Sequence, residues 1–360
     1  MPEMSAAAVL LDAGKVEIQE FALPEIGDDD GLLRVEATGV CGSDIAAYRG
    51  HAPFYELPCV LGHELVGRVE RLGEAAARRW RIAEGDRIVV EEYLPCGTCR
   101  GCLAGAYQMC EVKRYGGKSI HVAPSLFGGF SDYMYLHPQA IVHRAPEAVS
   151  AELLQLYIPI ANGLHWVQDV GEARVGSTVV VIGPGPHGLG CVVGAREAGA
   201  GTVILVGLPS DRVRLEVGQA LGADHVLTGS VAENTAAIAE LTEGLKADAV
   251  INAAGGAVAL EMAVAAAGPR GVVVQTGHAE GPGGSVAAIA AAVVERRLTI
   301  KGVLGRPSTA VPPALRLIAS GRYPLERMCT GTYSVAETEA ALRETPTDPE
   351  AIRSIVVPAR

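Results

Sequence analysis

Four cysteines stand close together in one short segment of the chain. Cys96, Cys99, Cys102 and Cys110 follow the pattern C-x2-C-x2-C-x7-C. Two-residue gaps let neighbouring thiolates reach one tetrahedral metal ion, and four thiolates leave no open coordination position. The spacing therefore predicts a closed, structural zinc site. Disulfides are disfavoured in a reducing compartment, and a C-x-x-C redox pair would not need four cysteines.

A glycine-rich motif with the spacing G-x-G-x-x-G lies further along the chain. It follows the apolar run 178–182 and opens a helix-like stretch, which is the context that dinucleotide binding requires. Gly183 would make the tight turn, Gly185 would let the backbone approach a pyrophosphate, and Gly188 would allow close helix packing. Pro186 and His187 complete the motif. The alternative is an ordinary strand-to-helix turn with spare glycines.

The second strand of a dinucleotide-binding fold usually ends in an acidic residue that holds the adenosine ribose. Here Gly207 stands at that point, and Ser210 and Arg212 follow. Without a carboxylate there is no repulsion against a 2′-phosphate, and a nearby arginine can pair with it. The sequence therefore favours NADP over NAD. A permissive site in which Asp211 reaches the ribose diol is the alternative.

Two clusters near the N-terminus carry further zinc-ligand types. One contains Cys41, Ser43 and Asp44, and the other contains His63 and Glu64. Thiolates and imidazoles bind zinc, and a carboxylate commonly orients the ligating imidazole. From spacing alone, a metal site is no more favoured than a structural role. In the structural role, Cys41 would be a small buried residue, and His63 and Glu64 would form a turn.

The sequence that positions these groups has two regions with different secondary-structure patterns. Residues 1 to about 150 contain short β-type runs punctuated by Gly, Pro and Asp, with no long helical period. From about residue 152, strand-like and helix-like stretches alternate, which predicts βαβ units and a parallel sheet. The run 355–357 reads as a closing strand that we expect to return to the first domain.

Composition limits the classes of function. The chain has 360 residues, 49% of them apolar, and a net charge of −11. Such a chain builds real cores, and its acidity makes nucleic acid and anionic membranes poor partners. The longest apolar run, 286–294, is far shorter than the roughly 20 residues of a membrane helix, and the N-terminus resembles no secretory signal. We therefore expect a cytoplasmic protein.

Taken together, these motifs resemble the zinc-containing alcohol and polyol dehydrogenases of the medium-chain dehydrogenase/reductase superfamily. The likeness covers nearly the whole chain. It is carried, in chain order, by residues 39–44, 61–64, 85–88, the four-cysteine loop, 128–130 and the glycine-rich motif.

The resemblance implies an α/β protein made of a GroES-like, β-rich catalytic domain (1–152 and 297–360) and a Rossmann domain with a doubly wound parallel sheet (153–296). A structural-zinc lobe would occupy about residues 91–113. Cys41, His63 and Glu64 would face a catalytic zinc, and Ser43 would hydrogen-bond the reacting oxygen. Arg353 would approach the cofactor phosphates, while Val274 and Thr276 would line the nicotinamide.

Three departures from the family pattern bear on the chemistry. Ile158 stands where relatives carry a further zinc ligand, Ala46 replaces a proton-relay histidine, and Gly207 replaces the ribose-binding acid. Cys41, His63, Glu64 and a water or substrate would still complete a tetrahedral site. The resulting enzyme would transfer a hydride between NAD(P) and an alcohol or carbonyl compound.

Two alternatives remain open. One is a reductase with a lost or weakened catalytic zinc that acts on a polarised C=C or C=N bond. The other is a non-catalytic nucleotide-sensing protein on the same scaffold. The expected partner is a small-molecule substrate, and a homodimer or homotetramer is typical of the family. Tyr55 and a few other ring side chains could border the substrate pocket, although packing is the preferred interpretation for each.

Overall fold

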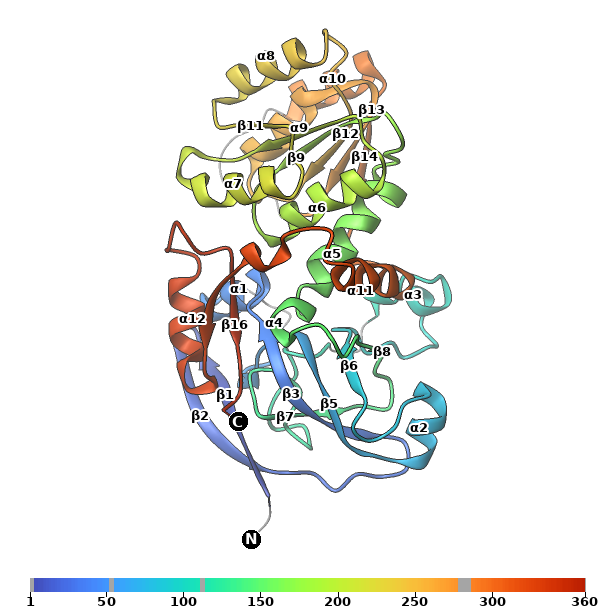
Figure 1. Ribbon diagram of the computed structural model, residues 1–360, viewed down its shortest axis with the longest axis vertical. Coiled ribbons are helices and arrows are strands. Elements are labelled where there is room, and N and C mark those ends of the chain that lie inside the picture. The colour runs from blue at the N-terminus through green and yellow to red at the C-terminus, as the bar shows by residue number, and fades with distance from the viewer. Residues whose placement is uncertain (1–2, 52–54, 111–113, 278–285, 360) are drawn as a thin grey trace. The chain divides into compact units, whose positions relative to one another are not determined.

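The computed structural model describes residues 3–51, 55–110, 114–277 and 286–359. The chain divides into two compact units (Figure 1). The first unit comprises Met1–Tyr157, Leu315–Ser320 and Cys329–Arg360, and the second comprises Ile158–Ala314 and Gly321–Met328. The second unit is therefore inserted into the first along the sequence.

Two sheets form the frame of the first unit. A small sheet has the order β2-β1-β4, and a larger sheet has the order β15-β16-β3-β5-β6-β8, with β7 paired to β3. The strands are β1 (Met4–Asp12), β2 (Lys15–Ala22), β3 (Gly31–Gly39), β4 (Cys59–Val60), β5 (Glu64–Leu72), β6 (Arg87–Val90), β7 (Tyr133–Leu136), β8 (Val142–Arg144), β15 (Cys329–Tyr333) and β16 (Arg353–Val356).

The chain's last strand returns to the first unit. β16 pairs antiparallel with the end of β3, where Ile355 lies opposite Gly39. The expectation of a closing strand from the tail is confirmed. The C-terminal strand thus lies beside the end of β3, although the two strands are more than 300 residues apart in the sequence.

The helices of the first unit are short. They are α1 (Gly42–Tyr48), α2 (Glu74–Trp80), α3 (Arg100–Leu103), α4 (Ala151–Leu154), α12 (Thr338–Glu344), and the 3-10 turns η1 (Tyr107–Met109) and η6 (Val335–Glu337). The core lies among the strands, where Leu33, Leu65 and Ile88 are fully buried. The candidate site residues of this unit lie at the ends of strands and in the short helix α1, which contains Ser43 and Asp44.

The second unit is built on one parallel sheet with the order β11-β10-β9-β12-β13-β14. In chain order this is 3-2-1-4-5-6, the arrangement of the doubly wound dinucleotide-binding fold. The strands are β9 (Thr178–Ile182), β10 (Thr202–Val206), β11 (His225–Leu227), β12 (Ala247–Asn252), β13 (Ala267–Gln275) and β14 (Thr299–Gly302).

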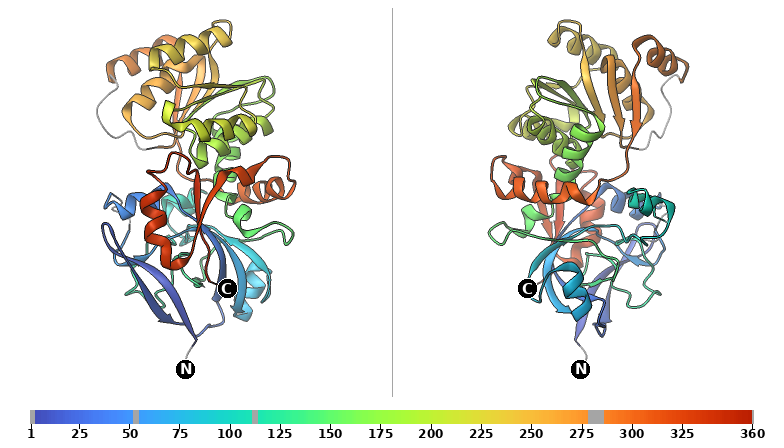
Figure 2. Two further views of the ribbon diagram at one scale, coloured as in Figure 1. Left: turned by 60° about the vertical axis from the view of Figure 1, so that its left-hand side comes forward. Right: turned by 90° about the vertical axis from the view of Figure 1, so that its right-hand side faces the viewer.

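Helices cover both faces of this sheet. Figures 1 and 2 show α6 and α7 on one face and α8, α9 and α10 on the other. The helical elements are α5 (Tyr157–Leu164), the π-helix η2 (His165–Val170), α6 (Pro186–Glu197), η3 (Pro209–Asp211), α7 (Arg212–Ala220), α8 (Val231–Leu241), α9 (Ala257–Ala266), α10 (Val286–Arg296), η4 (Ser308–Ala310), α11 (Val311–Ala319) and η5 (Leu325–Met328).

The unit boundaries differ from those expected from the sequence. The first lies between Tyr157 and Ile158 rather than after residue 152, and the second unit continues past residue 296 to Ala314. The reason for the second difference is β14, which pairs in parallel with β13 and so extends the sheet of the second unit. None of the helices described in the structure is long and apolar enough to cross a membrane.

Candidate metal and nucleotide sites

A strand pair brings the two N-terminal clusters together. β3 and β5 run antiparallel, with Gly39 opposite Glu64. Cys41 follows β3 and stands directly before α1, whereas His63 directly precedes β5. The ligand atoms of Cys41, His63 and Glu64 consequently lie within 4.8 Å of one another. The structure thus assembles the three residues that the sequence proposed as one site.

Asp44 organises this cluster from a fully buried position. Its Oδ2 accepts a hydrogen bond of 3.0 Å from the Cys41 N–H, and its Oδ1 accepts one of 3.3 Å from the Gly62 N–H. Oδ1 also lies 3.3 Å from Nδ1 of His63, although the angle does not make a well-formed hydrogen bond. The carboxylate therefore fixes the backbone on both sides of the cluster and orients the imidazole.

The opposite nitrogen of His63 faces Ser43. The two side chains lie 3.4 Å apart between Nε2 and Oγ. Burial lowers the pKa of His63, but the charge of the nearby Asp44 acts in the other direction and the pKa is raised well above its usual value. An imidazole whose Nδ1 faces a carboxylate presents Nε2 as the ligand atom once a metal displaces its proton.

Glu64 is engaged by an arginine from the other end of the chain. The Arg353 guanidinium pairs with the Glu64 carboxylate, and both side chains are only 1% exposed. Arg353 also donates to Oε1 of Gln155 at 2.8 Å and to the Val40 carbonyl at 3.0 Å. The sequence resemblance implied a role for Arg353 at the cofactor phosphates. The structure places it inside the first unit, against the candidate metal cluster.

The absence of a side chain at Gly39 makes this arrangement possible. A Cβ at Gly39 would lie 2.1 Å from both Arg353 Nη2 and Gln155 Oε1. Gly39 therefore leaves the space in which the arginine crosses the end of β3 to reach Glu64. The pair of Arg353 and Glu64 joins residues 289 positions apart, so no local sequence pattern predicts it.

The donor set fits a metal ion only in part. Cys41 and His63 supply a thiol and an imidazole at suitable separation, with Asp44 behind the imidazole. The charge of Glu64 is already balanced by Arg353. Ile158, the first residue of the second unit, is buried and has no ligand atom.

The four-cysteine lobe gathers its sulfur atoms as the spacing predicted. The four Sγ atoms all lie within 4.8 Å of one another, and those of Cys96 and Cys102 are 4.0 Å apart. Tetrahedral zinc with Zn–S bonds of about 2.3 Å requires sulfur separations near 4 Å. Hydrogen bonds from Thr98 and from the Cys99 N–H lower the pKa of Cys96 to about 6, which favours the thiolate. These donors fit a zinc ion well.

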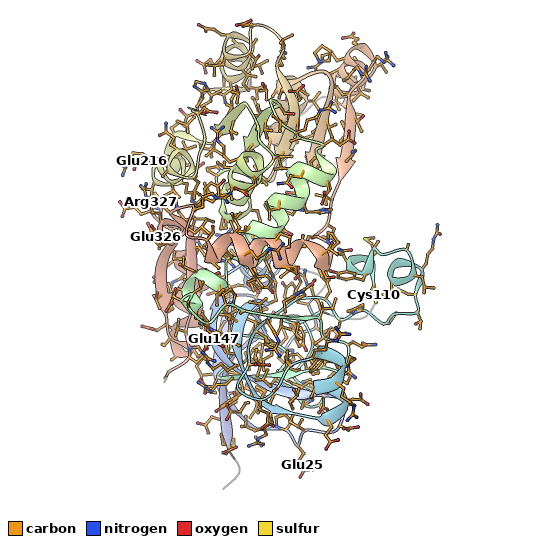
Figure 3. All side chains as sticks on the ribbon, turned by 45° about the vertical axis from the view of Figure 1, so that its right-hand side comes forward. Glu25, Cys110, Glu147, Glu216, Glu326 and Arg327 are labelled. Atoms are coloured by element: carbon orange, nitrogen blue, oxygen red, sulfur yellow. The ribbon has the colours of Figure 1, made fainter. Side chains whose placement is uncertain are left out.

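A buried carboxylate fastens this lobe to the first unit. Glu91 is fully buried, and it accepts a hydrogen bond of 2.8 Å from the Tyr107 hydroxyl in η1. Its other oxygen lies 2.7 Å from Nε2 of His143 in β8. Figure 3 shows the lobe, with Cys110 labelled, at the edge of the unit. Glu91 therefore joins η1 of the lobe to β8 of the first unit. The last residues of the expected lobe, 111–113, lie outside the described residues.

The glycine-rich motif forms the turn between β9 and α6. Gly183 has a φ of +95°, a conformation that favours glycine. A Cβ at Gly188 would lie 1.8 Å from the Gly183 carbonyl oxygen, whereas a Cβ at Gly185 would meet no atom within 4 Å. Gly188 is thus required by packing, and Gly185 leaves open space at the start of α6. A cradle of this kind fits a pyrophosphate group.

The other cofactor candidates take varied positions in the second unit. Gly207 follows β10, and the Asp211 Oδ2 accepts a hydrogen bond of 2.8 Å from the Leu208 N–H, so that this carboxylate caps the turn. Ser210 lies in η3 and Arg212 begins α7, where it pairs with Glu216 at 2.8 Å. His187 lies in the first turn of α6, with Pro186 before it.

Val274 and Thr276 lie at the carboxyl end of β13. Val274 is fully buried in the sheet, so its side chain faces the core of the unit. The Thr276 hydroxyl donates a hydrogen bond of 3.1 Å to the Asn252 carbonyl at the end of β12. Backbone groups at this edge, where parallel strands end, occupy the usual ligand-binding side of such a sheet.

Comparison with known proteins identifies the family of the chain. The family model of the alcohol dehydrogenase GroES-like domain matches residues 27–147, and that of the zinc-binding dehydrogenases matches residues 186–320. A Mycobacterium tuberculosis protein named a probable alcohol dehydrogenase is 36% identical over 94% of this chain and 95% of its own.

The chain belongs to the zinc-containing alcohol and polyol dehydrogenase family of the medium-chain dehydrogenase/reductase superfamily. A second relative, the erythritol/L-threitol dehydrogenase of Mycolicibacterium smegmatis, is 31% identical over 100% of this chain and 99% of its own. Among solved structures, the Thermotoga maritima alcohol dehydrogenase has a TM-score of 0.89 at 28% identity, with 99% of this chain and 100% of that chain covered. A Sinorhizobium meliloti protein bound to NADP has a TM-score of 0.87 at 30% identity, with the same coverage.

Membership of this family identifies the chain as an NAD(P)-dependent alcohol dehydrogenase or reductase. Some residues near the candidate metal cluster were not identified from the sequence. Gln155 and Arg114 belong to no motif, and Tyr55 was assigned to packing. Their proximity to the site comes from long-range contacts, which single-sequence patterns do not carry.

Proposed function

We propose that this dehydrogenase transfers a hydride between NADP and an alcohol or carbonyl substrate at a zinc site formed by Cys41, His63 and Glu64. The observation that supports this most directly is the grouping of these three ligand atoms within 4.8 Å, with Asp44 and Ser43 on either side of the imidazole. A bound zinc ion would supply positive charge that polarises the substrate oxygen.

The protein's own groups have distinct roles in this proposal. Asp44 orients His63 and holds the backbone of Cys41 in place. Ser43, which lies 3.4 Å from the imidazole, is placed to exchange a hydrogen bond or a proton with the substrate oxygen. In the second unit, the turn at Gly185 and the start of α6 would bind the cofactor pyrophosphate.

The preference for NADP rests on the end of β10. Gly207 offers no carboxylate to repel a 2′-phosphate, and Asp211 is occupied in capping the Leu208 N–H. Arg212 is largely exposed at the start of α7 and available to a phosphate in competition with Glu216. We expect kcat/KM to be at least tenfold higher with NADP than with NAD. A higher value with NAD would contradict this preference.

A second candidate function is a reductase without a firmly bound catalytic zinc, acting on a polarised C=C or C=N bond. Two observations favour it: Ile158 cannot ligate, and Arg353 already neutralises Glu64. Metal analysis separates the two candidates. Two zinc ions per chain in the wild type and one in Cys41→Ala would support the alcohol dehydrogenase, whereas one in both would support the reductase.

A further inference from the structure

The cationic side chain of Arg114 lies near the candidate metal cluster and, in the described part of the chain, forms no ion pair with a carboxylate. Arg114 follows the four-cysteine lobe and is partly buried. Among the described residues, its guanidinium makes one hydrogen bond, of 3.1 Å from Nη2 to the Tyr55 hydroxyl, and no ion pair. It also lies over the Tyr55 ring, 5.3 Å from the centroid. An arginine has five N–H donors, so most of those of Arg114 have no acceptor among the residues that the structure describes.

The backbone around Arg114 is held against the cluster. The Tyr115 N–H donates to the Glu92 carbonyl at 2.9 Å, and the Gly116 N–H donates to the Phe127 carbonyl at 2.7 Å. A Cβ at Gly116 would lie 3.2 Å from Nδ1 of His63. The segment that carries Arg114 therefore passes directly beside the candidate metal-binding histidine.

Tyr55 contacts the arginine and lies near His63 and Ser43. Burial raises the pKa of the Tyr55 phenol, whereas the neighbouring His63, Arg114 and a hydrogen bond with Ser43 act to lower it. The Arg114 guanidinium donates to the Tyr55 hydroxyl at 3.1 Å, and Tyr55 is near enough to His63 and Ser43 for both to affect its pKa. Tyr55 therefore places the guanidinium in the neighbourhood of the candidate metal cluster.

The charges near Arg114 leave room for an anionic ligand. Burial lowers the pKa of Arg114, whereas the neighbouring Tyr55 and Tyr93 and then Glu92 and Cys41 raise that pKa above its usual value. Neither Glu92 nor Cys41 lies within ion-pair distance of the guanidinium. A fixed, partly buried arginine favours carboxylate and phosphate groups because its planar fork pairs with two of their oxygens.

We propose that Arg114 and the Tyr55 hydroxyl form an anion-recognition subsite, so that the preferred substrate is an alcohol or carbonyl compound that also carries a carboxylate or phosphate. This inference rests on the proposed hydride transfer at the Cys41 and His63 cluster and adds the substrate class. Arg114 is a specificity-determining residue in this proposal and takes no part in the hydride step.

Matched substrates test the proposal. Each set shares a carbon skeleton and differs in one end group: propane-1,2-diol and lactate; glycerol and glycerol 3-phosphate; sorbitol, gluconate and sorbitol 6-phosphate. We expect kcat/KM with NADP to be higher for the charged member of at least one set. In Arg114→Gln this advantage should fall about 10- to 100-fold, mainly through KM, while kcat/KM for the neutral member stays within about twofold.

Further variants guard against misfolding and general charge effects. Arg114→Lys should retain part of the anion preference, and Tyr55→Phe should weaken it less than Arg114→Gln does. Arg78→Gln, which removes the same charge from an exposed position on α2, should change nothing. Equal losses for charged and neutral substrates in Arg114→Gln, with the same melting temperature, would overturn the proposal. The relative effects on carboxylate and phosphate members distinguish the two kinds of anion.

Binding separates failure of this inference from failure of the proposed function. Lactate, gluconate and the two phosphate esters are titrated into the protein–NADPH complex by calorimetry, with their neutral partners as controls. Hydride transfer to neutral substrates without anion-selective binding would reject the subsite and leave the proposed function standing. Anion binding that is lost in Arg114→Gln, without turnover of any substrate, would reject the proposed function and support the subsite.

Discussion

The buried pair of Glu64 and Arg353 makes a sharp prediction about stability. Both side chains are 1% exposed, and Arg353 has two further partners, Gln155 and the Val40 carbonyl. Arg353→Met would leave the Glu64 carboxylate buried without its counter-ion. Breaking such a pair from one side costs about 3–5 kcal/mol.

This free-energy change corresponds to a large shift in melting temperature. For a unit of this size, each kcal/mol lowers Tm by about 2–4 °C, so that Arg353→Met should lower the Tm of the first unit by about 6–20 °C. Differential scanning calorimetry measures this shift. Arg343→Gln is the matched control, because Arg343 lies in the same tail, is 62% exposed and forms an exposed ion pair with its neighbour Glu344. Its effect should be below about 0.5 kcal/mol.

A double variant tests the physical reason. Glu64→Gln removes the stranded charge, so Glu64→Gln/Arg353→Met should be more stable than the sum of the single effects predicts, by about 2–3 kcal/mol. If Arg353 served chiefly the cofactor phosphates, Arg353→Met would behave like Arg343→Gln in calorimetry and raise only KM for NADP. That result would refute the assignment of Arg353 to Glu64.

Three other measurements follow from the remaining sites. In zinc-free protein, iodoacetamide should label Cys96 first, and down to about pH 6, because the pKa of this thiol is lowered to about 6. Cys191 should stay unlabelled in native protein, because burial raises its pKa. Peptide mass spectrometry measures the labelling of both cysteines. Gly185→Ala should leave Tm within about 1 °C and raise KM for NADP, whereas Gly188→Ala should lower Tm by several degrees, since only the latter Cβ meets the backbone. Arg212→Gln should reduce kcat/KM for NADP about tenfold and leave that for NAD unchanged, as steady-state kinetics would reveal.

Two features of this structure could be predicted from local patterns in the sequence. The four cysteines lie within one short loop, and their spacing alone brings their sulfur atoms together. The turn at Gly183 likewise follows from a strand, three glycines and a helix in direct succession. Both predictions depend on geometry that a few consecutive residues determine, which is why they could be made without knowing the fold.

Contacts between distant segments could not be predicted in the same way. Arg353 meets Glu64 because β16 pairs with β3 while β3 pairs with β5, and each of these pairings joins remote parts of the chain. Tyr55 and Arg114 are brought together across 59 positions by loops that flank His63. A lone arginine or tyrosine in such a loop has no periodicity or spacing that distinguishes it from a surface residue.

The charge arrangement around Cys41 and His63 decides which experiment can reveal a catalytic metal. Asp44 is held by two backbone N–H groups and the imidazole, and Glu64 is held by Arg353, so no carboxylate of this pair depends on a metal ion for its counter-charge. Removal of zinc from this site should therefore alter the stability of the first unit little. The four-cysteine lobe is different, because its four sulfur atoms lie within 4.8 Å of one another, where thiolate charges would repel without a metal ion. Chelation should therefore lower Tm through the lobe alone, so Tm does not report on a zinc ion at Cys41 and His63. The metal content and activity of Cys41→Ala, compared with those of the wild type, establish whether the second zinc ion is present.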